Sequence, residues 1–162
     1  MNNVFDLVAD FYGQDEEWNS VLRQSYVENF LRSKSWQGAE DKELTEYWDY
    51  ITLLCIYLGN SENFLGDMSK DDFIDCIAWC GRNVADFALT DKKVAKFLDV
   101  MDELYTHLHN KKIIMSCAAP SEAKAKLLPE GKLTLMDYEG NFLPDCNKFN
   151  LYSTADLPAK IF

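Results

Sequence analysis

The stretch TDKKVAKFLDVMDELYTHL, residues 90–108, decides the fold class of this chain. Large apolar residues recur in it at spacings of three and four, which is the period of an α-helix with one buried face. Thr90 is of the residue type that caps a helix N-terminus. The stretch therefore predicts an amphipathic helix, whose apolar stripe consists of Val94, Phe97, Leu98, Met101, Leu104, Tyr105 and Leu108.

Upstream of this stretch, the same period predicts four more helices. Gly13 is expected to end the first of them, and Asp15 to cap the second, which carries one stripe from Trp18 to Phe30. Sustained helical periods with short connections are typical of a helical bundle. The sequence thus predicts a mainly α protein with a bundle of about five helices in residues 1–110, the four upstream helices covering residues 3–12, 15–36, 41–58 and 70–88.

The segment 70–88 has two apolar faces, one of large and one of small residues. Gly81 lies in the small face and costs about 1 kcal/mol relative to Ala in a helix interior. The close approach of a neighbouring helix would explain that glycine, so we expect this segment at the centre of the bundle. The large face contains Phe73, Ile77, Val84 and Phe87, and the small face Ala78, Gly81, Ala85 and Ala88.

The composition changes near residue 110. Residues 1–110 contain 21 acidic and 9 basic residues, a net charge of −12, whereas residues 111–162 contain 6 and 7, a net charge of +1. The second part predicts a strand at 113–117, a short helix at 120–128 and a β-hairpin turning at 139–141. A lone hairpin is marginal in water, so we expect an appendage, residues 111–162, packed on the bundle. The apolar residues 161–162 favour continuation into a longer native protein, with docking of the chain end as the alternative.

Charge and composition exclude several classes of function. The net charge of −11 and the pI of about 4.5 disfavour nucleic acids and anionic membrane surfaces, which bind clustered cations. The longest apolar stretch, residues 51–58, is too short to span a bilayer. Five cysteines, an odd number, and no secretory leader favour a reducing, cytoplasmic location. The seven glycines form no phosphate-binding loop, and we expect no cofactor.

One group of residues suggests a metal site. Cys76 and Cys80 are four apart and share a helix face, and His107 lies in the helix of residues 90–108. His109 points about 200° away from His107 while that helix continues. The favoured interpretation is structural, with the cysteines in the core and the histidines at a helix C-terminus. The zinc site remains a minor alternative.

A partner-binding surface is predicted on the helix of residues 70–88. Trp79 and Arg82 share a polar face of this helix, and tryptophan and arginine are typical of the central residues of protein interfaces. The alternative interpretation is that the appendage covers Trp79. The leading hypothesis is a non-enzymatic interaction or regulatory module whose partner is a protein, with a basic partner favoured. The alternatives are an acidic nucleic-acid mimic that inhibits a DNA-binding protein, and an enzyme with an unrecognised site, with or without a metal. The predicted surface consists of Asp75, Trp79, Arg82 and Asp86.

Overall fold

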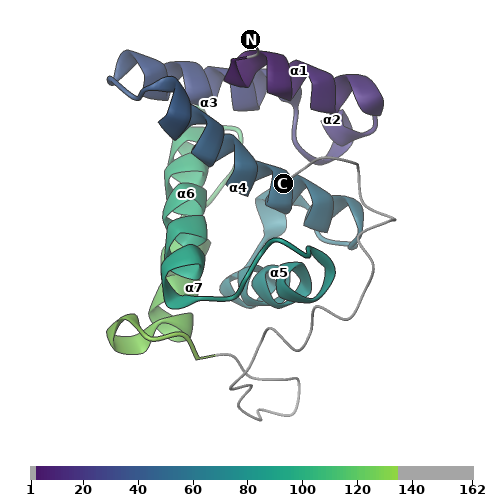
Figure 1. Ribbon diagram of the computed structural model, residues 1–162. Coiled ribbons are helices and arrows are strands. Elements are labelled where there is room, and N and C mark those ends of the chain that lie inside the picture. The colour runs from purple at the N-terminus through teal and green to yellow at the C-terminus, as the bar shows by residue number, and fades with distance from the viewer. Residues whose placement is uncertain (1–2, 135–162) are drawn as a thin grey trace.

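The structure is a computed structural model, which describes residues 3–134 of the chain (Figure 1). These residues form seven α-helices and two short 3-10 helices, with no strand between residues 3 and 134. The prediction of a mainly α fold is confirmed, and the hairpin at 139–141 lies outside the described residues. The helices are α1 (Val4–Gln14), α2 (Trp18–Val21), α3 (Gln24–Trp36), α4 (Asp41–Gly59), α5 (Lys70–Asn83), α6 (Asp91–Asn110) and α7 (Ala119–Leu127), and the 3-10 helices are η1 (Leu65–Asp67) and η2 (Pro129–Gly131).

Helix α4 is the centre of the fold. Every residue from 51 to 58 is buried, so this helix is covered on all sides over two turns. It packs against α1, α2, α3, α5 and α6, and Figure 1 shows it between the α1–α3 layer and α5. The expectation that residues 70–88 form the centre is wrong, because α5 has exposed and half-buried residues along its length.

Helix α5 ends at Asn83, five residues before the predicted end. The Asn83 side chain donates a hydrogen bond to the Trp79 carbonyl at 2.8 Å and thereby satisfies a carbonyl at the helix end. Phe87 is buried, although it lies in the loop after α5, which is why the apolar period misled the prediction. Gly81 makes room for Leu89 of the same loop, which a Cβ at this position would overlap. Gly81 therefore allows Leu89 of this loop to pack closely against α5, whereas the expected neighbour was another helix.

The predicted second helix is in fact two helices. Leu22 and Arg23 have extended backbone angles and separate α2 from α3. The Tyr12 hydroxyl donates to the Leu22 carbonyl at 2.5 Å, and the Asn19 side chain accepts the Gln24 N–H at 2.9 Å. These two bonds replace the helical hydrogen bonds that the bend removes. Helix α1 also continues through Gly13, which does not end it.

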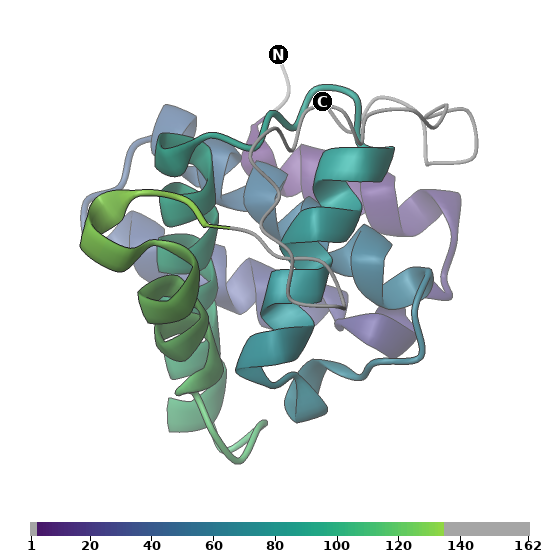
Figure 2. The ribbon, with the colours of Figure 1, turned by 90° about the horizontal axis from the view of Figure 1, so that it is seen from below.

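Helix α7 joins residues after 110 to the bundle. It packs against both α5 and α6, with Ala123 and Leu127 buried in the contact (Figure 2). The short helix predicted at 120–128 is therefore confirmed. The strand predicted at 113–117 is wrong, since these residues form an irregular connection. Within residues 3–134, no helix combines the length and the apolar character needed to cross a bilayer.

Candidate functional site

The predicted partner-binding residues are only partly brought together. The Tyr57 hydroxyl donates to Asp75 Oδ2 at 2.7 Å, and the Trp79 ring lies edge-on to Tyr57 at 5.9 Å, so both residues contribute to the α4–α5 contact. Arg82 is half-buried on α5. Asp86 is exposed in the following loop, so the expectation that it shares a helix face with the other three is wrong, because α5 ends before it.

The predicted metal ligands do not converge. Cys76 and Cys80 are both buried on α5. His107 lies elsewhere, with its ring edge-on to Phe30 of α3 at 5.5 Å. Among residues 3–134, no three His, Cys, Asp or Glu side chains are grouped so that they would hold a metal ion.

Burial also works against nucleophilic chemistry at two of the thiols. It raises the pKa of Cys55 to about 12 and the pKa of Cys76 well above the ordinary value for a thiol. A cysteine nucleophile needs the opposite shift, because the thiolate is the reactive form. Desolvation lowers the pKa of His107, with smaller contributions from Lys111 and Lys34, and it therefore favours the neutral imidazole.

A groove that the sequence did not predict lies at the C-terminal end of α4. It has a volume of about 380 Å³ and is formed by α2, the C-terminal end of α4 and the loop that follows α4. Phe64 stands at this groove and is 70% exposed. We call it the Trp18–Phe64 groove; its apolar lining is Trp18, Val21, Leu58, Phe64 and Leu65, and its acidic lining is Asp15, Glu17 and Glu62.

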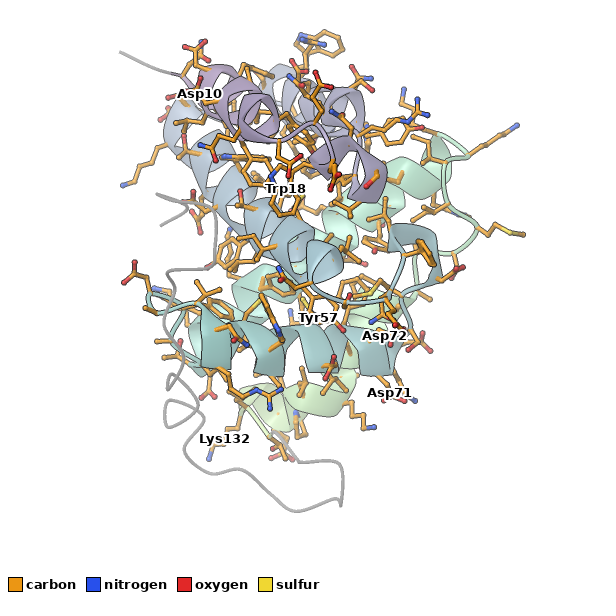
Figure 3. All side chains as sticks on the ribbon, turned by 90° about the vertical axis from the view of Figure 1, so that its right-hand side faces the viewer. Asp10, Trp18, Tyr57, Asp71, Asp72 and Lys132 are labelled. Atoms are coloured by element: carbon orange, nitrogen blue, oxygen red, sulfur yellow. The ribbon has the colours of Figure 1, made fainter. Side chains whose placement is uncertain are left out.

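The Trp18 ring forms a fixed part of the groove floor. It stacks on Phe11, with the ring centroids 4.9 Å apart and the planes 25° from parallel. Gly59 at the end of α4 lets the ring lie close to the helix, since a Cβ there would be 2.7 Å from Trp18 Cζ3. Figure 3 shows Trp18 between the α1–α2 layer and α4. The floor is therefore built by close packing and does not depend on a bound molecule.

The loop that presents Phe64 is anchored on both sides of this residue. The Asn63 side chain donates to the Tyr57 hydroxyl at 2.8 Å. The hydroxyl of Tyr105, a buried residue of α6, donates to the Leu65 carbonyl at 2.7 Å. Figure 3 places Tyr57 between α4 and α5. Phe64 is thus held at the surface by contacts with the interior, which lowers the entropy that a partner must remove on binding.

The acidic lining of the groove has no neutralising partner in the described part of the chain. None of Asp15, Glu17 and Glu62 belongs to any of the four ion pairs found there. Residues 3–22 contain five acidic residues and no basic one, and the arginines near α1 and α2, Arg23 and Arg32, are not part of the groove lining. A groove lined by one sign of charge concentrates ions of the opposite sign, and this groove will attract cations.

Sequence reasoning missed the groove because its residues come from three separate segments. Trp18 belongs to α2, Leu58 to α4 and Phe64 to the loop before η1. Periodicity describes one element at a time and does not report which helix ends meet. The signal that the sequence does hold is Phe64 itself, an aromatic residue that directly follows the polar residues 60–63 and lies outside any helical stripe.

Comparison with protein-family models, curated proteins and solved structures gave no significant match to this chain. The function is therefore inferred from the geometry, burial and charge of the residues themselves.

Proposed function

We propose that this protein is a non-enzymatic interaction or regulatory module that binds a partner protein through the Trp18–Phe64 groove. The observation that carries the proposal is Phe64, an exposed aromatic side chain on an anchored loop. Burying such a side chain against a partner removes apolar surface from water, which is the main favourable contribution to protein association. Aromatic residues beside a preformed pocket are typical of binding hot spots.

The size of the groove indicates how a partner would engage it. A volume of about 380 Å³ is at the lower end of the range for ligand sites and accommodates a few side chains. A partner would therefore insert a protruding segment, while its surrounding surface contacts the rim. The fixed floor and the anchored loop favour binding with little rearrangement of this chain.

The surface around α5 remains a second location for the same function. Asp86 is the first member to test there, because it is exposed in the loop after α5, whereas replacing Asp75 or Trp79 also disturbs the contact with Tyr57. A loss of binding in a Trp79 variant would report stability and recognition together. Arg82 is half-buried and makes contacts of its own, so the binding of Arg82→Ala is compared with the free energy of unfolding of the same variant.

The distribution of ion pairs supports an interaction module over a nucleic-acid mimic. A mimic needs a continuous acidic surface that resembles a phosphate backbone. On the surfaces of α3 to α7, lysines lie among the carboxylates and pair with them, at distances of 2.6–3.7 Å. The pairs are Lys34–Glu103, Lys96–Glu46, Lys124–Asp99 and Lys126–Asp71. No observation on residues 3–134 favours the third hypothesis, an enzyme with an unrecognised site, with or without a metal.

The test is affinity capture with matched exposed aromatic residues. The full chain and the variants Phe64→Ala, Trp36→Ala, Arg82→Ala and Asp86→Ala are immobilised, and the proteins each retains from a cell extract are compared by quantitative mass spectrometry. Trp36 is the control because it is 81% exposed and lies outside the groove. We expect a set of proteins that Phe64→Ala loses and Trp36→Ala retains. Equal retention by all four variants contradicts the proposal, and loss only in the Arg82 or Asp86 variant moves the site to α5 and the loop that follows it.

A further inference from the structure

We infer that the occupant of the Trp18–Phe64 groove is a segment of a partner protein in which a bulky apolar residue has lysine or arginine residues next to it. The inference rests on the proposed function and specifies the chemistry of the partner. It follows from where the carboxylates lie relative to the apolar floor.

The carboxylates of the lining come from two separate segments of the chain. Asp15 and Glu17 lie just before α2, and Glu62 belongs to the loop after α4. Trp18 and Leu58 line the same groove and provide apolar surface. An apolar side chain inserted in the groove therefore has carboxylates of both segments beside it, and cations next to it in the partner sequence are complementary to them.

The apolar part of the occupant is required by the lining itself. Phe64, Val21 and Leu65 offer apolar surface that a wholly polar cationic segment would leave in contact with water. Apolar burial supplies affinity, whereas exposed charge pairs contribute only modestly and mainly guide the encounter. A lysine-rich segment without an apolar residue is therefore expected to bind much more weakly.

A second copy of this chain is a poor occupant on the same grounds. It would bring its own net charge of −11 to a groove that already has an acidic lining. Like charges brought together across an interface oppose association. The charge of the groove thus selects a cationic partner over self-association.

The probes are three fluorescein-labelled peptides of equal length, measured by fluorescence anisotropy with the full chain. The first alternates lysines with leucine and phenylalanine, the second has glutamate at every lysine position, and the third has serine at every apolar position. We expect the first peptide to bind at least tenfold more tightly than either of the others. We also expect its affinity to fall as salt rises, because exposed charges attract it.

Variants of the groove and a charge-matched control locate the binding. Phe64→Ala is expected to weaken the first peptide about tenfold. The double variant Glu17→Lys with Glu62→Lys is expected to weaken it by a similar factor. The control is Glu40→Lys with Glu43→Lys, two exposed acids at the other end of α4, which lies about 24 Å away at 1.5 Å per residue. That is well beyond the screening length of about 8 Å, so the control should bind as the unaltered chain does.

The outcomes separate the inference from the proposed function. The inference is overturned if the glutamate peptide binds as tightly as the lysine peptide. It is also overturned if Glu40→Lys with Glu43→Lys weakens binding as much as Glu17→Lys with Glu62→Lys does. If none of the peptides binds while protein capture still depends on Phe64, the inference fails and the proposed function stands. If capture does not depend on Phe64, the proposed function fails as well. A dimer in sedimentation velocity that Phe64→Ala dissociates would identify a second copy as the occupant and overturn the inference.

Discussion

Two groups of carboxylates in this protein have opposite surroundings. Between α3, α4 and α6, Glu103 accepts a charged hydrogen bond from Lys34 at 2.6 Å and one from the Tyr47 hydroxyl at 2.7 Å. Around the Trp18–Phe64 groove, by contrast, Glu17 and Glu62 take part in no ion pair within residues 3–134. The first group links three helices, and the second adds negative charge to a surface without linking any.

This difference separates carboxylates that stabilise the fold from carboxylates that are available to a partner. Lys34 has a side chain only 17% exposed, and its charge depends on Glu103 for compensation. Glu62 is exposed to water, so its removal leaves no buried charge behind. Neutralising Glu103 should therefore lower stability and leave binding unchanged, whereas neutralising the carboxylates of the groove should weaken binding and leave stability unchanged.

The largest effect is expected from Glu103→Ala. It removes the acceptor of both Lys34 and Tyr47 and leaves a largely buried ammonium group without its partner. We expect the free energy of unfolding to fall by about 2–3 kcal/mol. Urea denaturation of this variant beside Glu62→Ala, which should lose less than about 0.5 kcal/mol, measures the contrast directly. Equal losses in the two variants would show that the two groups do not differ as described.

A smaller effect is expected from the floor of the groove. Gly59→Ala places a Cβ 2.7 Å from the Trp18 ring, which is held by its stacking on Phe11. The cost of overpacking exceeds the gain in helix propensity, and we expect a loss of about 1.5 kcal/mol. Gly13→Ala is the matched control, because no described atom lies within 4 Å of the added Cβ. It should stabilise α1 by about 0.5–1 kcal/mol, so the two thermal midpoints should move in opposite directions.

Asp49 of α4 is an intermediate case between the two groups. It is half-buried, as Glu103 is, but it belongs to none of the ion pairs within residues 3–134. Desolvation, with a smaller contribution from Glu46, raises its pKa from 3.8 to about 6. The folded state therefore holds the proton more tightly than the unfolded state, and stability falls as the pH rises from about 4 to 6.

Asp49→Asn removes this pH dependence. At pH 7 the variant should be more stable than the unaltered chain by about 1 kcal/mol, a value reduced from the full shift because the group is partly solvated. Near pH 3.5 the gain should largely disappear, since the carboxyl group is then mostly protonated in both states. Urea titrations at the two pH values check this, and a gain of equal size at both would mean that ionisation of Asp49 is not the cause.

The parts of the fold that the sequence predicts are those decided within one element. The stripe of residues 90–108 appears as α6, with its N-cap at Thr90 as expected. The prediction failed where tertiary contacts override the period. Leu22 and Tyr26 fit one helical stripe, yet the Tyr12 hydroxyl holds the Leu22 carbonyl in a bend. Phe87 continues the period of α5 but is buried from a loop.

The groove was beyond sequence reasoning for a related reason. It exists because Gly59 and Trp18 are in contact across 41 positions of the chain, and nothing local marks either residue as part of a surface. The predicted anchor, Trp79, is of a residue type that is common in binding surfaces, but its ring packs against Tyr57 in the contact between α4 and α5. Composition therefore identified the type of residue that a binding surface needs, whereas only packing decides which aromatic residue is exposed beside a groove, and within the described residues Phe64 is in that position.

The smallest effect on stability is expected from neutralising the rim, with Glu17→Gln and Glu62→Gln combined. Neither carboxylate has an ion pair to lose within the described residues, and relief of repulsion from neighbouring acids offsets other small changes. We expect the free energy of unfolding to change by less than about 0.5 kcal/mol, while binding of a basic, apolar peptide weakens several-fold. Glu103→Ala should show the reverse, with lower stability and unaltered peptide affinity in the folded protein. A rim variant that loses more stability than affinity would mean that these acids support the fold, and that the groove is not where the partner binds.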